Sequence, residues 1–249
     1  MVMKTAAQAV RKKMSKVIES VWQANLLIDR VGLASLTWGN ASQIDHGKGL
    51  IAIKPSGIAY DKLKRDDIVL TDMKGVKIAS NLRPSSDLPS HLALYRAFPS
   101  IGAVVHTHSI FATSFAQACR PVPCIGTTHA DYSSMEIPVT NPMSKSKIST
   151  DYEKNIGESI VHKMQQSRID PRQCPFILVA NHGPVTWGQD APKAVENAIV
   201  LEQICQMALW TITLNKNIKT IPQALIDKHF FRKHGVHAYY GQEKPNKKR

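Results

Sequence analysis

The sequence predicts an α/β fold with a largely antiparallel central sheet flanked by helices. Apolar residues recur at helical spacing through residue 29 and again over 192–214. Short apolar runs of strand length lie between these segments, and two of them, at 68–71 and 76–78, flank a turn that contains Gly75. Hairpins mixed with helices favour a largely antiparallel sheet over a doubly wound parallel one.

The individual elements follow from these periodicities and from local start signals. The first helix is expected to run through about Asp29, because the apolar residues before it keep a helical spacing. The polar segment 36–42 predicts a loop or strand edge, and Thr150 with Glu153 forms a capping-box pattern at a helix start. The other expected elements are strands at 50–53, 101–107 and 175–181, a hairpin over 68–78, a loop-rich stretch to 142, and helices at 88–98, 109–118, 150–165, 192–214 and 222–232.

Composition predicts a single domain over 1–249, with basic N- and C-terminal extensions. The chain has 249 residues, 43% of them hydrophobic, and no repeat or long linker divides it. Its 32 basic and 19 acidic residues give a formal charge of +13, which is consistent with nucleic acid, an anionic metabolite or a compositional bias. Aromatic residues are scarce and not interleaved with basic ones, which argues against a nucleic-acid partner.

Three further observations concern the compartment. No apolar stretch approaches the roughly 20 residues that a membrane span needs, and Arg11 interrupts the N-terminal segment before a signal-peptide core could form. The four cysteines show no Cys-x-x-Cys spacing. We therefore expect a cytoplasmic protein with reduced cysteines and no membrane partner.

The most informative motif is His106-Thr-His108, which closes the apolar run 101–105. Side chains two residues apart on a strand point to the same face, so these imidazoles are expected to lie together. His182 closes a second apolar run over 176–181. A lone buried histidine is more often a hydrogen-bonded core residue. A pair joined by a matching strand end favours a divalent metal, above all zinc in an open site of the catalytic kind.

Two short loops are candidate anion sites. Lys54, Ser56 and Gly57 follow a strand directly, where a glycine allows backbone amides to approach an anion. Ser85 and Ser86 precede a predicted helix, whose free amides can bind phosphate. An ordinary turn and a plain helix N-cap explain the same residues equally well. Neither loop matches a nucleotide-binding motif.

Three more residues are candidates for metal binding or proton transfer. Asp87, directly after the serine pair, could complete a metal shell or serve as a base. Asp131 lies in the polar segment 127–132 between a histidine and a tyrosine, and Tyr240 lies near the C-terminus. Solvation of a loop is the competing explanation for the polar segment 127–132. For the adjacent Tyr239 and Tyr240, the alternative is that one of them simply packs.

These segments, in this order, resemble the class II aldolase/adducin family and, within it, the L-ribulose-5-phosphate 4-epimerase branch. The resemblance covers about residues 15 to 242, nearly the whole chain. The His-Thr-His and His-Gly-Pro elements mark the wider family, and the C-terminal Lys-His-Gly and Tyr-Tyr-Gly-Gln elements point to the epimerase branch. The matching pieces are Leu36-Thr-Trp-Gly-Asn40, Ile53-Lys-Pro-Ser-Gly57, Pro84-Ser-Ser-Asp87, Ala97-Phe-Pro-Ser-Ile-Gly102, Val105-His-Thr-His-Ser109, Gly126-Thr-Thr-His-Ala-Asp-Tyr132, His182-Gly-Pro184, Asp227-Lys-His229, Lys233-His-Gly235 and Ala238-Tyr-Tyr-Gly-Gln242.

The resemblance implies a role for each matched position. It implies zinc ligands at Asp87, His106, His108 and His182. It implies that the substrate and its phosphate are bound at Asn40, Lys54, Ser56, Gly57, Ser85 and Ser86. The acid/base pair would be Asp131 and Tyr240, with the tyrosine supplied by a neighbouring subunit of a four-fold homotetramer. Thr128, Glu153 and His229 would lie in or near the site.

The implied reaction interconverts L-ribulose 5-phosphate and D-xylulose 5-phosphate, so the partner would be a phosphorylated ketopentose. The hydrogen at C4 is not α to the carbonyl, so a retro-aldol cleavage of C3–C4 replaces simple deprotonation. Zinc would stabilise the resulting enediolate by several kcal/mol. The aldehyde fragment would then turn its other face before the bond re-forms.

Two alternatives stay open. An aldolase similar to L-fuculose-phosphate aldolase would release the aldehyde, but such enzymes usually carry Glu where Asp87 stands. A non-catalytic binding module similar to the adducin head would be expected to lose the metal histidines, which are all present here. The chain departs from the family pattern at Asn181, where Ser is common, and in the tail 243–249.

Overall fold

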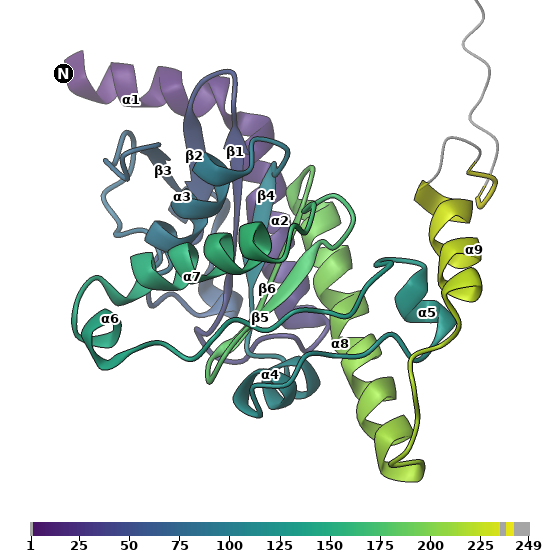
Figure 1. Ribbon diagram of the computed structural model, residues 1–249. Coiled ribbons are helices and arrows are strands. Elements are labelled where there is room, and N and C mark those ends of the chain that lie inside the picture. Colours follow the sequence, from purple (N-terminus) through teal and green to yellow (C-terminus); the bar gives the residue numbers. More distant parts are fainter. Residues whose placement is uncertain (1, 235–237, 242–249) are drawn as a thin grey trace, which may run out of the picture.

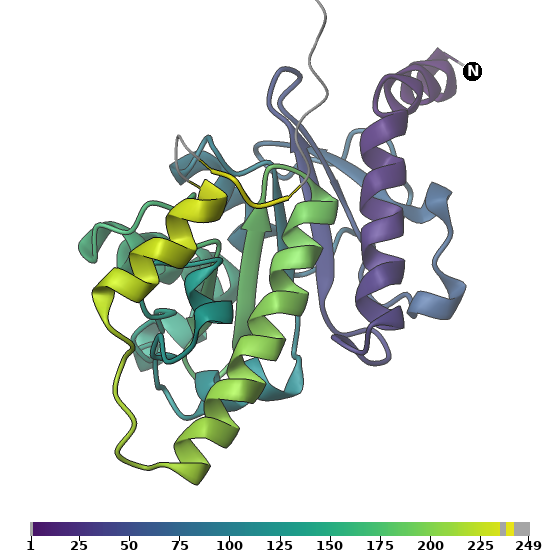
Figure 2. The ribbon, with the colours of Figure 1, turned by 90° about the vertical axis from the view of Figure 1, so that its right-hand side faces the viewer.

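The chain forms a six-stranded antiparallel sheet covered by helices on both faces (Figures 1 and 2). The computed structural model describes residues 2–234 and 238–241. The strand order is β3-β2-β1-β4-β6-β5, and each neighbouring pair is antiparallel. The strands are β1 Asn40–Asp45, β2 Leu50–Ile53, β3 Val69–Asp72, β4 Ala103–His106, β5 Phe176–Val179 and β6 Gly183–Gly188. The predicted fold class is confirmed.

Helices cover both faces of this sheet (Figure 1). The helices are α1 Val2–Lys13, α2 Ser15–Arg30, α3 Leu88–Ala97, α4 Ile110–Gln117, α5 Thr127–Ala130, α6 Lys145–Ser149, α7 Tyr152–Gln166, α8 Ala191–Leu214 and α9 Gln223–His234, with short 3-10 turns at Tyr60–Lys62 and Arg65–Asp67. No helix among residues 2–234 and 238–241 has both the length and the apolar character that crossing a bilayer demands.

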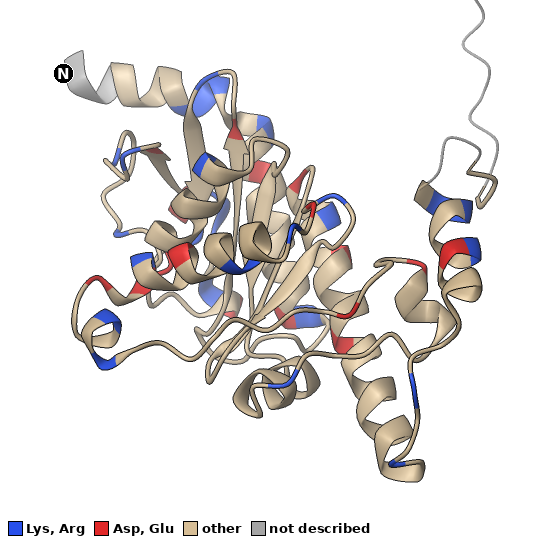
Figure 3. Ribbon diagram, viewed as in Figure 1, with Lys and Arg blue, Asp and Glu red and all other residues tan. Residues whose placement is uncertain are grey.

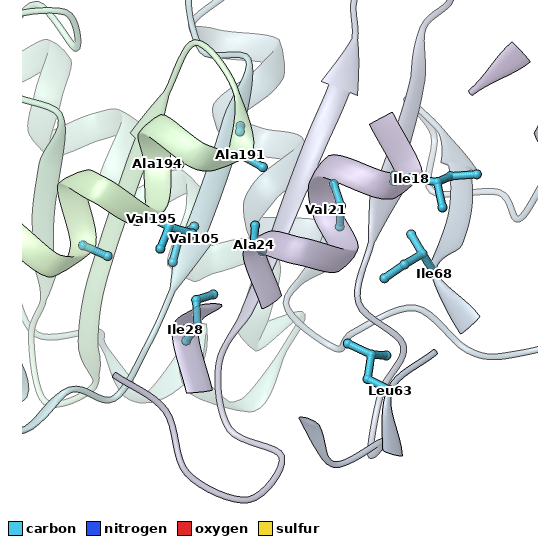
Figure 4. Close-up of a cluster of buried hydrophobic side chains, with 14 of the residues drawn as sticks. Ile18, Val21, Ala24, Ile28, Leu63, Ile68, Val105, Ala191, Ala194 and Val195 are labelled. Carbon is cyan, nitrogen blue, oxygen red and sulfur yellow. The ribbon is translucent and has the colours of Figure 1, made fainter. Parts of the chain in front are cut away.

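Alternation along the strands divides the core into two layers. Ala103 and Val105 of β4 join the cluster formed with α2 and α8, whereas Val104 joins the cluster formed with α3 and α7. Figure 4 shows the first layer, in which Ala24 of α2 and Ala194 of α8 are among the buried side chains. His106 follows this alternation onto the face of Val104, so β4 ends by presenting an imidazole on the α3–α7 side.

The helix predictions are largely confirmed, but the short helices α5 and α6 were not anticipated, and two further points are corrected. The expected first helix is interrupted at Met14, whose φ and ψ of −97° and 8° leave the regular helical range, so α1 and α2 are separate. The predicted capping box is wrong. Asp151 adopts a left-handed conformation with φ 44° before α7, and the Thr150 hydroxyl donates to the carbonyl of Ser146.

The strand predictions missed β6, gave the start of β1 only as a loop or strand edge, and overextended other strands. The segment 175–181 forms β5 only to Val179. The following β6 was not anticipated because it begins at Gly183, directly after the turn that carries His182. In the hairpin over 68–78, the second arm is reduced to a single bridge between Lys77 and Thr71. Gly75, at φ +84°, closes that turn as expected.

Charged residues are distributed over many elements of the described chain (Figure 3). This matches the spread of basic residues along the sequence. The sites of interest are therefore defined by local clusters rather than by one basic face.

Candidate metal centre and active-site cavity

Three histidines converge at the end of β4. His106 is the last residue of that strand, His108 follows two residues later, and His182 lies in the turn between β5 and β6. The Nε2 atom of His106 lies 3.1 Å from Nε2 of His108 and 3.1 Å from Nε2 of His182. One ligand atom from each ring lies within 4.8 Å of the others. The predicted convergence of these rings from two strand ends is observed.

Close backbone approach makes this convergence possible. His106 pairs with Val185 across β4 and β6, which brings the β5–β6 turn beside the His-Thr-His segment. A side chain at Gly183 would place its Cβ 2.8 Å from the carbonyl oxygen of Thr107. A side chain at Gly39 would lie 2.8 Å from the carbonyl oxygen of His106, in a backbone conformation with φ +74°. Both glycines are therefore required by space, and Gly39 is required by its backbone conformation as well.

The donor set suits a divalent cation. Nδ1 of His106 lies 2.9 Å from the carbonyl oxygen of Pro184, which can only accept, so Nδ1 carries the hydrogen and Nε2 offers a lone pair. Burial, followed by the neighbouring imidazoles, lowers the pKa of His182 to about 4, and burial also lowers the pKa of His108. Neutral rings with converging nitrogens match the requirement of a metal such as zinc for unprotonated imidazole.

The histidines form one wall of a cavity of about 570 Å³. Most of the residues that the resemblance assigns to metal and substrate lie around it. The cavity is lined by the predicted residues Asn40, Lys54, Ser56, Gly57, Ser85, Ser86, Asp87, His106, His108 and His182, together with Thr37, Trp38, Gly39 and Pro55.

The two predicted anion loops lie side by side in this cavity. The amide of Ser56 donates to the carbonyl of Arg83 over 3.0 Å, and the amide of Ser85 donates to the carbonyl of Lys54 over 2.9 Å. These bonds hold the loops together without using the serine hydroxyls. The amide of Leu88 is already bonded to the carbonyl of Ser85, and the amide of Asp87 donates to the Ser85 hydroxyl over 3.3 Å, so these two amides at the start of α3 are not free to bind an anion.

Lys54 contributes a buried cation to the cavity. The residue is 1% exposed, its Nζ lies 3.4 Å from the carbonyl oxygen of Thr37, and it lies 4.8 Å from the centre of the Tyr60 ring. Burial lowers the pKa of Lys54. No carboxylate among the described residues forms an ion pair with it. An anionic ligand would supply that missing charge.

Asp87 lies in the same cavity, outside the group of three histidines. Its Oδ2 accepts a hydrogen bond from Nδ2 of Asn40 over 2.6 Å. Burial opposes ionisation of Asp87, but the nearby imidazoles of His106 and His91 and the Asn40 bond outweigh it, so its pKa is lowered. The carboxylate therefore faces the site in its charged form, as a fourth metal ligand requires.

The residues expected to transfer protons form a second cluster away from this cavity. Asp131 receives hydrogen bonds from His229 over 3.0 Å and from Arg232 over 2.9 and 2.6 Å. The ring centre of Tyr240 lies 4.9 Å from Arg232 Cζ and 4.5 Å from Nζ of Lys233. We call these five residues the α5–α9 cluster. None of them lines the histidine cavity.

The last two predicted residues lie in other places again. Thr128, on α5, lines a separate cavity of about 320 Å³ with Trp210 of α8. Glu153 lies in the first turn of α7, outside the histidine cavity. Its neighbour Tyr152, which the sequence did not single out, has its hydroxyl 3.5 Å from Nδ1 of His182. No local motif marks a tyrosine at a helix start as a partner of a distant histidine.

Comparison with known proteins defines the family. The family described as "Class II Aldolase and Adducin N-terminal domain" matches residues 19–209. The chain belongs to the class II aldolase/adducin family.

Individual relatives show which members of the family the chain is similar to. The chain is 46% identical over 230 residues to the L-ribulose-5-phosphate 4-epimerase UlaF of Salmonella paratyphi A and, equally, to that of Salmonella typhi; each match covers 92% of this chain and 100% of the relative. Among solved structures, an L-fuculose 1-phosphate aldolase superposes with a TM-score of 0.72 at 22% identity, covering 86% of this chain and 94% of the other. The structural match supports the fold alone.

Proposed function

We propose that this protein is an L-ribulose-5-phosphate 4-epimerase, interconverting L-ribulose 5-phosphate and D-xylulose 5-phosphate. One observation carries the proposal: a single cavity joins three converging imidazoles to two serine loops and a buried lysine. A phosphorylated ketose needs both parts, one for its oxygens near the carbonyl and one for its phosphate. The 46% identity to the two Salmonella epimerases, over their full length, supports this substrate.

Residues of one chain would bind the two ends of the substrate. His106, His108, His182 and Asp87 would hold zinc, whose chemistry when bound is to stabilise negative charge as C3–C4 breaks, by several kcal/mol. The phosphate would accept hydrogen bonds from the hydroxyls of the serine loops and lie near the buried Lys54. The loop residues in this role are Ser56, Gly57, Ser85 and Ser86, with Asn40 orienting the Asp87 carboxylate.

The bond changes balance without any further reactant. Removal of the proton from the C4 hydroxyl lets the C3–C4 electron pair move onto the C1–C3 fragment, giving an enediolate and glycolaldehyde phosphate. The phosphate loops would retain the aldehyde while it turns. Re-addition to its opposite face and return of a proton to the C4 oxygen then give the epimer.

Asp131 and Tyr240 would be the two proton carriers, one for each face. They share Arg232 and Lys233 as partners, yet neither lines the cavity of its own chain. We therefore assign both to the cavity of a neighbouring subunit in a homotetramer, with His229, Thr128 and Glu153 near that junction. Although partial burial opposes ionisation, the bonds from Arg232 and His229 lower the pKa of Asp131. The carboxylate is thus ionised at neutral pH, which is the state that a general base needs before it takes up a proton.

Product analysis tests the proposal. Purified protein reconstituted with zinc is incubated with L-ribulose 5-phosphate, and the sugar phosphates are separated. D-Xylulose 5-phosphate as the product supports the epimerase. Free glycolaldehyde phosphate with dihydroxyacetone would instead identify an aldolase, and no conversion at full zinc occupancy would favour a binding module related to the adducin head.

Complementation tests the shared site. The variants His106→Ala and Tyr240→Phe each alter a different part of the proposed site. Co-expressed chains would form mixed tetramers in which some cavities receive an intact histidine group from one subunit and an intact tyrosine from the next. Activity well above that of either variant alone is expected. Mixed tetramers as inactive as the parents would place all catalytic groups within one chain.

A further inference from the structure

Glu202 of α8 accepts hydrogen bonds from the start of α4, a helix that begins two residues after His108. Its Oε1 accepts a hydrogen bond from the amide of Phe111 over 2.9 Å, and its Oε2 accepts one from the amide of Ala112 over 2.9 Å. The helix begins at Ile110, and His108 precedes it by two residues. One carboxylate therefore binds two successive amides of the first helical turn.

This carboxylate replaces the usual local cap. The first amides of a helix have no partner within the helix, and the residue before it commonly supplies one through its side chain. Here Ser109 occupies that position in an extended conformation but makes no side-chain cap hydrogen bond. Glu202, 90 and 91 positions away in sequence, accepts these bonds instead. Its negative charge also suits the positive end of the helix.

The segment 107–109 is consequently held at both ends. On the strand side, the amide of Thr107 donates to the carbonyl of Pro184 over 3.4 Å, and Nδ1 of His106 donates to the same carbonyl over 2.9 Å. On the helix side, Glu202 holds the first turn. His108 lies between these two anchors, and its Nε2 must come within 3.1 Å of Nε2 of His106.

Glu202 itself is held in a rigid part of the molecule. Its neighbours on α8, Leu201, Ile204 and Cys205, are buried in one cluster with Ala112 and other residues of α4. This packing fixes the Glu202 backbone relative to the start of α4, and the two amide bonds hold the carboxylate there.

We propose that Glu202 is a positioning residue for the metal centre, setting the place of His108 through the first turn of α4. The proposal rests on the proposed metal site but is distinct from it, since Glu202 does not line the cavity. Partners that orient a metal ligand typically contribute 10- to 100-fold to metal affinity. Because Glu202 acts through the backbone, we expect the lower end of that range.

The test compares Glu202→Gln with Glu196→Gln. Glu196 lies on the same helix and pairs with Lys193 at the surface, so its variant removes the same charge without touching α4. Zinc affinity is measured by chelator competition, and cobalt is substituted for zinc to record the visible spectrum of the metal. Glu202→Gln should bind zinc about tenfold more weakly and show an altered cobalt spectrum. Glu196→Gln should match the parent protein in both.

Hydrogen exchange provides a readout that needs no metal. The amides of Phe111 and Ala112 should exchange faster in Glu202→Gln, and Glu202→Asp, one methylene shorter, should behave in the same way if the first variant fails to fold. A lower Tm with unchanged zinc affinity and cobalt spectrum would reduce Glu202 to an ordinary helix cap and overturn the proposal. A parent protein that binds no zinc would instead defeat the metal assignment itself.

Discussion

The histidine cavity and the α5–α9 cluster are both rich in ionisable groups, yet their groups are satisfied in opposite ways. In the cavity, three imidazole nitrogens converge, and the buried Lys54 forms no ion pair with a carboxylate of residues 2–234 and 238–241. In the cluster, Asp131 is bonded to His229 and Arg232 and lies 3.5 Å from Nζ of Lys233. The cavity holds groups that can bind a ligand, whereas the Asp131 carboxylate of the cluster already has its hydrogen-bond and ion-pair partners.

This difference separates binding from proton transfer. A group that must bind an ion is best left without a protein partner of opposite charge, so that the ligand becomes its partner. A proton carrier can instead be held by partners from its own chain and, as proposed above, act in the cavity of a neighbouring subunit. The predictions below test this division, beginning with the largest expected effect.

Loss of a single imidazole should abolish the metal site. His106 is central because its Nε2 lies 3.1 Å from Nε2 of both His108 and His182, so His106→Ala removes the nitrogen that approaches both other rings and leaves them with Asp87 alone. We expect zinc content to fall below about a tenth of the parent value and epimerase activity to fall by at least about 10³-fold. His162→Ala, on α7 and outside the cavity, is the matched control. Metal analysis showing full occupancy in His106→Ala would remove this residue from the ligand set.

The tyrosine variant should separate chemistry from metal binding. Tyr240→Phe removes one hydroxyl and retains the ring that lies near Arg232 and Lys233. Turnover should fall by about 10²–10⁴-fold, the range for loss of a general acid or base, while zinc content stays unchanged. Tyr239→Phe, one residue earlier and similarly exposed, is the control. Equal turnover in both variants would exclude Tyr240 from proton transfer.

Much of the cavity could be predicted from the sequence because its signals are local. The His-Thr-His spacing and the two serine loops each lie within five residues, and strand alternation fixes which way such side chains point. The antiparallel sheet could also be predicted, since the hairpin near Gly75 excludes a purely parallel arrangement. Resemblance to a family then supplied the residues that pattern alone leaves ambiguous, such as Asn40.

The parts that could not be predicted depend on contacts between distant segments. Tyr152 meets His182 from 30 positions away, and Glu202 meets α4 from about 90. The capping-box prediction was wrong because Asp151, between α6 and α7, takes a left-handed conformation. The sequence indicated only one helix start in this segment. The contacts that bind Asp131 likewise join α5 to α9 over about 100 residues. Periodicity carries no information at such separations.

A loop serine should affect substrate binding more than turnover. Ser56 lies in the cavity, and its amide, not its hydroxyl, holds the loop to Arg83. Ser56→Ala therefore removes a donor to the phosphate without disturbing the loop. A hydrogen bond to a charged group contributes about 1.5–3 kcal/mol, so KM should rise by roughly 10- to 100-fold with a smaller change in kcat. Ser100→Ala, on the surface, controls for the substitution, and an unchanged KM in Ser56→Ala would contradict the phosphate assignment.

The smallest expected effect concerns the stability of the α5–α9 cluster. Because the pKa of Asp131 is lowered in the folded protein, its ion pairs stabilise the fold above the unfolded pKa of about 4 and cease to do so as the pH falls through the lowered value. Asp131→Asn in the metal-free protein should lower Tm by about 2–4 °C at pH 7, and the difference should shrink progressively as the pH falls below about 4. The exposed Asp61→Asn is the control. A difference in Tm that stayed constant over this pH range would show that the carboxylate charge does not hold α9 against α5, so the cluster would have to be stabilised by the apolar contacts of Ile226 instead.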